Sequence, residues 1–403
     1  MRLNFPPFPL AVSLLLVVSS WSSLAAERFT GPWDLAKLKQ TPAATWGERK
    51  GLVQEVLYEG EPFGGKATRV FAYYARPEKV EGRLPAMVCV HGGGGKAFPE
   101  WATLWAQRGY AALAMDLAGV GPNGKRLPDG GPGQGDADKF RVFSGDGVKE
   151  MWTYHAVAAV IRGHSLLAGR PEVDAARIGI TGISWGGYLT CIVTGLDDRL
   201  KVSVPVYGCG FLHENSAWLR QFANLGPDAT ARWVQVFDPS RYLPGVGCPI
   251  LFLNGTTDFA YPLDSYQKCY RLVTAPVTLG ITPTLAHSHQ AGWAPPEIGL
   301  FADRVLRAGA PLPKVGDMQT KGDGVSASFA SQVPVLKGQL HFAKAEGAWQ
   351  KRAWTSVEAK LEDGRVSAVL PASPRPMVYF LTVTDSRRAT VSTPHVIVSE
   401  AQK

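Results

Sequence analysis

Between about residues 52 and 308, short apolar runs typical of strands alternate with longer segments that have a helical period. This alternation predicts a mostly parallel, eight-stranded sheet with helices on both faces, an α/β architecture. The expected strands are 52–58, 68–75, 86–90, 111–116, 177–182, 201–206, 250–254 and 277–282. The expected helices are 99–107, 148–167, 186–196, 263–272 and 296–308.

Two further regions depart from this rhythm. Residues 207–247 form an aromatic-rich excursion between two expected strands, where α/β enzymes commonly carry a lid. From about Lys314 short alternating runs follow one another without a helical period, after a proline-rich linker. This pattern predicts a separate, immunoglobulin-like β-sandwich of about 90 residues. The expected domains are therefore 26–313 and 314–403.

The N-terminal residues 1–25 have the pattern of a signal peptide. Arg2 provides a positive charge, residues 10–18 an apolar core, and Ser23-Leu24-Ala25 a small-x-small cleavage site. The apolar run is shorter than the about 20 residues that cross a bilayer. We therefore expect a secreted or periplasmic protein with no membrane partner after cleavage. An uncleaved N-terminal anchor is the alternative.

Composition excludes several classes of protein. Apolar residues make up 45% of the 403-residue chain and charged residues 19%, which is a globular balance. The formal net charge of +8 is scattered along the chain, so the sequence does not support nucleic-acid binding. Five cysteines are too few for a disulfide scaffold, although export would permit one or two bridges.

A candidate nucleophile lies in the run Gly182-Ile183-Ser184-Trp185-Gly186, which fits the pattern G-x-S-x-G. There the glycines allow a sharp strand-to-helix turn that exposes the serine hydroxyl. Because glycine is frequent in this chain, the pattern alone is weak, and an ordinary glycine turn is the alternative. A buried strand is expected before it and a helix after it, and this context favours a nucleophile.

A serine needs a base and an orienting carboxylate, which follow it in the order Ser, Asp, His in this arrangement. Asp258 comes directly after the expected strand 250–254, whereas Asp264 lies inside the next helix pattern. Only His287 and His289 follow the last expected strand of the sheet. His287 comes first and follows a small residue, so we prefer it as the base, with His289 as the alternate base. A metal site from these two histidines lacks a third ligand at suitable spacing, so no metal is expected.

The glycine run His91-Gly92-Gly93-Gly94-Gly95 ends another expected strand. Four glycines allow backbone amides to approach a substrate closely, and the run resembles the oxyanion-hole loop of lipases and esterases. The amide of Gly93 or Gly94 and that of Trp185 are the candidate donors. A phosphate-binding loop is the alternative, but no G-K-[ST] follows, and no cofactor is expected.

Taken together, these motifs resemble α/β-hydrolases of the acetylxylan esterase, dienelactone hydrolase and prolyl oligopeptidase-like group. The likeness covers roughly residues 50–308. Its most specific stretch is 173–182, VDAARIGITG, and the run 254–262, NGTTDFAYP, is similar to the acid loop of the group. The sequence departs from the group at His287-Ser288-His289, where one histidine is usual.

The resemblance implies a serine hydrolase with the α/β-hydrolase fold that cleaves esters, with deacetylation of a polysaccharide or of small esters as the leading expectation. A prolyl-oligopeptidase-like peptidase or amidase is one alternative. Those enzymes carry a propeller before the catalytic domain, whereas a short segment precedes the first strand here. A non-catalytic carbohydrate-binding protein is the other alternative, and the sequence leaves the oligomeric state open.

Overall fold

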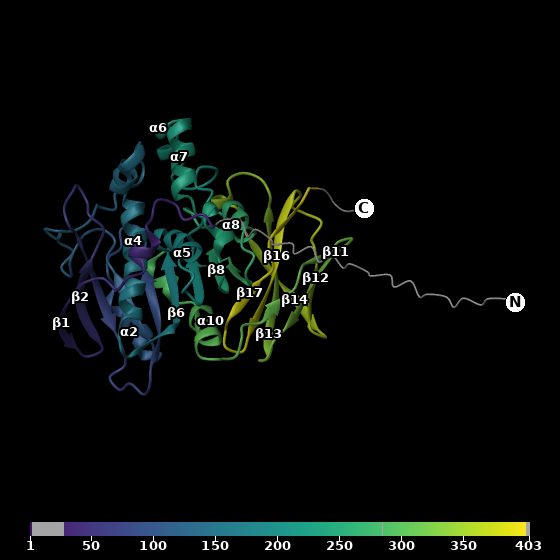
Figure 1. Cartoon of the computed structure of the whole chain (residues 1–403). Coiled ribbons are helices and arrows are strands. Elements are labelled where there is room, and N and C mark those ends of the chain that lie inside the picture. The colour runs from purple at the N-terminus through teal and green to yellow at the C-terminus, as the bar shows by residue number, and fades with distance from the viewer. Residues whose placement is uncertain (2–27, 284, 400–403) are drawn as a thin grey trace.

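The structure is a computed structural model that describes residues 1, 28–283 and 285–399 (Figure 1). Apart from Met1, the expected signal peptide lies outside the described residues. Within the described residues, no helix combines the length and apolar character needed to cross a membrane.

A nine-stranded sheet organises the first three quarters of the chain, in the order β1-β2-β3-β5-β4-β6-β7-β8-β9. Strands β5, β4, β6, β7, β8 and β9 run parallel, and β1, β2 and β3 add antiparallel pairs at one side. The strands are β1 (Ala44–Lys50), β2 (Val53–Glu59), β3 (Arg69–Ala75), β4 (Leu84–Val90), β5 (Ala111–Met115), β6 (Val173–Ile183), β7 (Val202–Val206), β8 (Ile250–Gly255) and β9 (Val277–Thr282).

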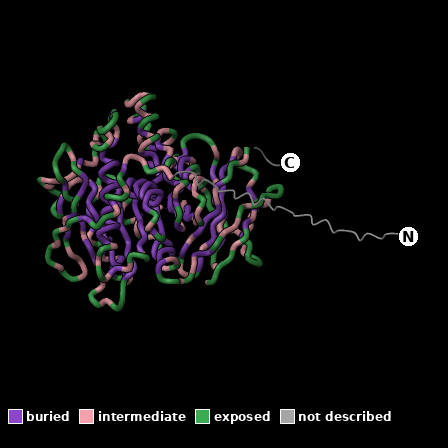
Figure 2. The backbone as a smooth tube through the Cα atoms, viewed as in Figure 1, coloured by how far each residue is buried: buried purple, intermediate pink, exposed green. Residues whose placement is uncertain are grey.

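All eight predicted strands of this sheet are present, but the predicted number was wrong because β1 is a ninth. Strand β1 lies at the sheet edge and none of its residues is fully buried, so its sequence lacks the apolar run of a central strand. Strands β4 and β5, by contrast, are buried along their whole length. Figure 2 shows that buried residues, drawn in purple, lie mostly inside the molecule.

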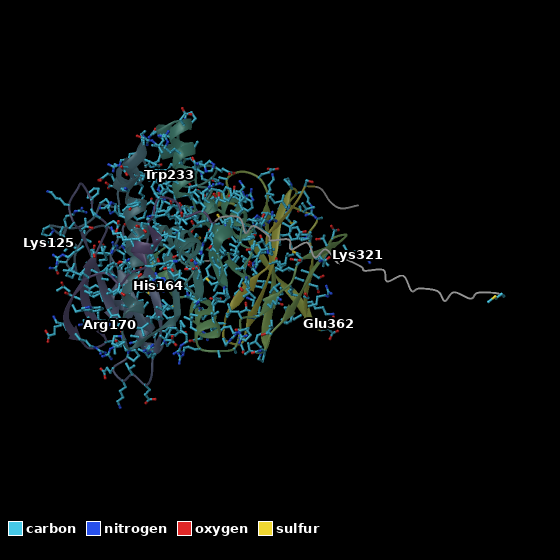
Figure 3. All side chains as sticks on the ribbon, in the orientation of Figure 1. Lys125, His164, Arg170, Trp233, Lys321 and Glu362 are labelled. Carbon is cyan, nitrogen blue, oxygen red and sulfur yellow. The ribbon has the colours of Figure 1, made fainter. Side chains whose placement is uncertain are left out.

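Helices cover the sheet where the helical period predicted them. They are α2 (Pro99–Gln107), α4 (Trp152–Ala168), α5 (Trp185–Leu196), α8 (Leu263–Tyr270) and α10 (Pro296–Leu306), with the short α1 (Leu35–Leu38) and α9 (His289–Trp293). Helices α4 and α5 pack against each other over the central strands. Figure 3 marks His164 of α4, whose side chain is buried.

Two insertions interrupt the alternation. Residues 119–147 contain α3 (Asp136–Lys139) and lead into the 3₁₀ turn η1 (Gly145–Glu150). Residues 207–247 contain α6 (Leu219–Leu225), α7 (Pro227–Phe237) and the 3₁₀ turns η2 (Pro239–Arg241) and η3 (Leu243–Gly245). Trp233 and Phe237, four residues apart on α7, share one face and are buried (Figure 3 marks Trp233). These aromatic side chains therefore pack inward.

The C-terminal region is antiparallel throughout. Its strands follow one hydrogen-bonded path, β10-β12-β15-β14-β13-β16-β17, to which β11 and β18 add. They are β10 (Lys314–Val315), β11 (Gln319–Lys321), β12 (Gly324–Ala330), β13 (Val335–Lys344), β14 (Thr355–Glu362), β15 (Arg365–Val369), β16 (Met377–Asp385), β17 (Thr390–Ser392) and β18 (Val396–Val398), with the 3₁₀ turn η4 (Trp349–Lys351).

This region forms a near-barrel and is not a clear sandwich, which corrects the immunoglobulin-like expectation. The β14–β15 hairpin connects β13 to β12, so the path continues where a sandwich would divide into two sheets. Alternation of apolar residues identifies strands but does not say which strands pair. Figure 3 marks Lys321 and Glu362, exposed side chains of this region.

The five cysteines all lie within the described residues, where each is buried and none forms a disulfide.

Candidate active site

Ser184 occupies the turn between β6 and α5, and its backbone has a positive φ, which is rare for residues other than glycine. Its φ is 59° and its ψ −120°, a left-handed conformation for a residue with a side chain. Such a conformation costs about 1–3 kcal/mol and is found at functional sites. A Cβ at Gly186 would overlap the carbonyl oxygen of Val90, and one at Gly182 that of Gly186. The glycines of the motif are therefore required by close backbone approach.

The structure brings Ser184, His287 and Asp258 into one hydrogen-bonded row, from the ends of β6, β9 and β8. The Ser184 hydroxyl donates to His287 Nε2 at 2.9 Å, and His287 Nδ1 donates to Asp258 Oδ2 at 2.6 Å. The Asp258 side chain is fully buried, and its Oδ1 accepts from the amides of Ala260 and Tyr261 at 2.9 and 2.7 Å. This arrangement can remove a proton from the serine hydroxyl and hold the imidazole in the required tautomer.

His289, the alternate base, does not join this row. Its Nε2 accepts a hydrogen bond from the backbone amide of Gly92 at 3.0 Å. The two histidines are separated by Ser288, which caps α9 by accepting from the Ala291 amide at 3.0 Å. Because the chain turns into a helix at this point, the two imidazoles are directed to different partners.

Two aromatic rings enclose the imidazole of His287. The Tyr207 ring stacks on it at 4.4 Å between centroids, and the Tyr207 hydroxyl donates to the carbonyl of Ala286. The centroid of the Phe259 ring lies 4.7 Å from that of the same imidazole, and Phe259 is 60% exposed. Sequence reasoning grouped Tyr207 with the lid and assigned no role to Phe259. The position of Tyr207 directly after β7, at the carboxyl edge of a strand, was the available signal.

The glycine run after β4 lies against the nucleophile. A Cβ at Gly92 would lie 2.8 Å from Ser184 Cβ, and one at Gly93 would lie 2.9 Å from Trp185 Cδ1. Trp185 is the first residue of α5, where amides lack helical partners. In the part of the chain that the structure describes, the amides of Gly93, Gly94 and Trp185 donate to no other group. All three predicted donors are therefore available, and Gly93 is in closer contact with Trp185 than Gly94 is.

A buried lysine near this loop escaped sequence reasoning. The Lys139 ammonium lies 5.1 Å from the ring centroid of Trp152 and 5.0 Å from that of Trp185, and it donates to the carbonyl of Gln134. Burial lowers the pKa of Lys139 to about 8. Nothing in its α3 run, DADK, distinguished this lysine from a solvated one.

Across residues 28–283 and 285–399, no three histidine, cysteine or acidic side chains are grouped closely enough to hold an ion.

Part of the chain is similar to a family of known proteins. Residues 51–220 match the family described as acetyl xylan esterase (AXE1). The acetyl esterase Axe7A of Xylanibacter ruminicola is 24% identical over 230 residues, which are 54% of this chain and 52% of that protein. This chain therefore spans about half the length of that relative.

Two solved structures have the same fold. The acetyl xylan esterase of Paenibacillus sp. R4 has a TM-score of 0.51 and 22% identity, over 63% of this chain and 87% of that one. Acetyl xylan esterase 1 of Thermoanaerobacterium sp. JW/SL YS485 has a TM-score of 0.51 and 18% identity, over 69% and 95%. At these identities the likeness shows the fold.

Proposed function

We propose that this chain is a carboxylic ester hydrolase with Ser184 as nucleophile, His287 as base and Asp258 as orienting carboxylate. The match of residues 51–220 to the acetyl xylan esterase (AXE1) family supports this proposal. The observation that carries the proposal is the hydrogen-bonded row from the Ser184 hydroxyl through His287 to Asp258, at 2.9 and 2.6 Å. The left-handed backbone at Ser184 supports it further, since the strain serves to present the hydroxyl.

The proposed reaction proceeds through an acyl-enzyme. The Ser184 oxygen attacks the acyl carbon while His287 Nε2 takes the hydroxyl proton, and the Asp258 carboxylate stabilises the resulting imidazolium. The amides of Gly93 and Trp185 donate to the oxyanion. His287 then returns the proton to the leaving alcohol. Water, deprotonated by His287, attacks the acyl-enzyme and releases the carboxylic acid and Ser184.

An acetyl ester, on a polysaccharide or on a small alcohol, is the proposed substrate. The description of the matching family and that of the Xylanibacter relative support an acetyl group. The exposed ring of Phe259 beside His287 supports a ring-shaped alcohol, because aromatic faces pack on flat apolar surfaces. Residues 207–247 would act as the lid over this site.

We expect acetyl esters to be hydrolysed with a kcat/KM about 10-fold or more above that of bulkier acyl esters, because extra groups must be accommodated at the acyl side. The measurement compares p-nitrophenyl acetate and acetylated xylan with feruloyl and methyl-uronate esters and with a proline-linked anilide. Faster cleavage of the anilide would favour the peptidase alternative. Retention on xylan with no turnover of any substrate would favour a carbohydrate-binding protein.

We also propose that the protein is exported and cleaved after Ala25, because residues 1–25 carry the charge, apolar core and small-x-small site that signal peptidase recognises. Expressed in a bacterium, the protein should be found outside the cytoplasm with Ala26 or Glu27 as its first residue, as measured by mass spectrometry. An exported protein that still begins at Met1 or Arg2 would contradict cleavage.

A further inference from the structure

Both backbone groups of Gly92, next to the nucleophile, are occupied by side chains. The Gly92 amide donates to His289 Nε2 at 3.0 Å. The Gly92 carbonyl accepts from His91 Nδ1 at 2.8 Å and from Gln134 Nε2 at 3.2 Å, and from the Gly95 amide at 3.1 Å. Glycine backbones rotate freely, so contacts of this kind decide which conformation the loop adopts.

The direction of the Gly93 amide follows from these contacts. The Gly92 carbonyl and the Gly93 N–H belong to one planar trans peptide and point in opposite directions. Hydrogen bonds that fix the carbonyl therefore fix the Gly93 N–H as well. The Gly92 amide cannot also donate to the oxyanion, because its N–H already donates a hydrogen bond to His289 Nε2.

The imidazole of His289 is held in place by its surroundings. Its ring lies 4.8 Å from that of Phe98, and Ser288 caps the helix that His289 begins. A Cβ at Gly292 of this helix would lie 2.9 Å from Ile183 Cγ2, next to the nucleophile. A Cβ at Gly95 would lie 2.7 Å from His289 Nε2, so the loop closes tightly around this imidazole.

The contact requires one protonation state. An Nε2 that accepts a hydrogen bond carries no proton, so His289 is neutral and protonated on Nδ1. If His289 were charged, its Nε2 would carry a proton that points at the Gly92 N–H, and the hydrogen bond could not form. Burial, with the nearby His287, lowers the pKa of His289, and burial lowers the pKa of His91 to about 4, so both rings stay neutral near pH 7. The titratable groups near His289 are His91, whose ring centroid lies 6.5 Å away, and His287. The carboxylate of Asp258 pairs with His287.

From these contacts we propose that His289 is a positioning residue. Its neutral imidazole holds the His91–Gly92 peptide through the Gly92 N–H. Together with the contacts on the Gly92 carbonyl, it keeps the adjoining Gly92–Gly93 peptide turned so that the Gly93 N–H faces the oxyanion. The inference rests on the proposed ester hydrolysis. Protonation of His289 removes the acceptor and frees the Gly92 N–H. The His91–Gly92 peptide can then rotate and shift the adjoining Gly92–Gly93 peptide, so transition-state stabilisation declines as His289 becomes charged.

Three variants separate positioning from general structural support. His289→Leu should lower kcat for p-nitrophenyl acetate by about 10²-fold, the loss typical of one oxyanion donor, with KM changed less than about twofold. His289→Gln should recover about 10-fold of that loss, because the glutamine Oε1 can accept from the Gly92 amide. In a plot of kcat against pH, the fall at acid pH that His289 causes should be absent from this variant. His287→Ala should abolish turnover, since it removes the base.

A second readout does not depend on turnover. NMR spectra are recorded of Ser184→Ala protein labelled with ¹⁵N-histidine, with and without the additional change His289→Gln. The signals that disappear with His289→Gln belong to His289. At pH 7 they should show an unprotonated Nε2 and a protonated Nδ1. This result, with the kcat loss in His289→Leu and its recovery in His289→Gln, supports the inference. A protonated Nε2, or equal kcat for the Leu and Gln variants, overturns it. If the wild type hydrolyses no ester but the tautomer is as stated, the proposed function fails while the peptide contact stands.

Discussion

Replacing Ser184 with alanine is expected to lower kcat for ester hydrolysis by at least ~10⁴-fold, because the change deletes the attacking oxygen. The loss should appear in kcat, since the rest of the substrate-binding surface is unchanged. The fold should be retained, because alanine occupies less space than serine and the φ of 59° is equally unusual for either residue. Only the hydrogen bond to His287 is lost within the row.

Turnover of p-nitrophenyl acetate, with circular dichroism as a check on folding, measures this effect. Ser144→Ala is the matched control, because Ser144 is exposed and its side chain does not cap the turn that follows it. The control should keep wild-type kcat. If folded Ser184→Ala protein retained more than a tenth of the wild-type rate, Ser184 would not be the nucleophile.

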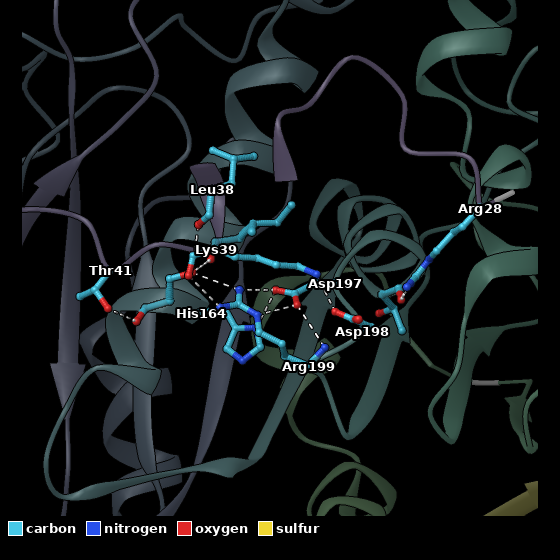
Figure 4. A network of polar contacts seen from close by, with 11 residues as sticks. Arg28, Leu38, Lys39, Thr41, His164, Asp197, Asp198 and Arg199 are labelled. Carbon is cyan, nitrogen blue, oxygen red and sulfur yellow. Dashed lines mark hydrogen bonds and ion pairs between the residues drawn. The ribbon is translucent and has the colours of Figure 1, made fainter. Parts of the chain in front are cut away.

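Removing Asp197 is expected to lower the free energy of unfolding by about 3–5 kcal/mol, because it leaves a buried polar cluster without its anion. Figure 4 shows this cluster. The buried carboxylate accepts from His164 Nδ1 at 2.8 Å and from Arg199 Nε and Nη2 at 2.8 and 2.7 Å. Arg199 also donates to the carbonyl of Lys39 at 3.2 Å and to Ser165 Oγ at 3.0 Å, so it connects the N-terminal segment to α4.

The neighbouring residue provides a matched control. Asp198 pairs with Lys39 at 2.6 Å, but its side chain is 64% exposed. An exposed pair contributes little, so Asp198→Ala should change the free energy of unfolding by less than about 1 kcal/mol. Urea denaturation of Asp197→Ala, Asp198→Ala and wild type measures the difference. Equal losses in the two variants would show that the buried cluster does not stabilise the fold.

The effect of Asp197 should also depend on pH. Burial would raise the pKa of Asp197, but hydrogen bonds from Arg199 and His164 outweigh it and hold the pKa well below its usual 3.8. A carboxyl whose pKa is depressed on folding stabilises the protein fully above its unfolded pKa, and this contribution is lost as the pH falls through the folded value. The gap between wild type and Asp197→Ala should therefore be constant near neutral pH and shrink below about pH 4.

The sequence by itself determined those features that depend on local patterns. Apolar runs located all eight predicted strands of the main sheet, because buried parallel strands need continuous apolar segments. The glycine pattern located the turn at Ser184, because close backbone approach admits no side chain there. Asp258 and His287 could be chosen because residues after parallel strands meet at one edge of the sheet.

Only the tertiary structure decided what depends on contacts between distant segments. His287 and His289 are two residues apart and chemically identical, and the turn into α9 directs one to Ser184 and the other to Gly92. The pairing of β14 with β15 made a near-barrel from strands whose alternation also suits a sandwich. Lys139 is buried because the rings of Trp152 on α4 and Trp185 on α5 pack against its ammonium group. Distances between side chains on separate elements arise from packing, which local patterns do not encode.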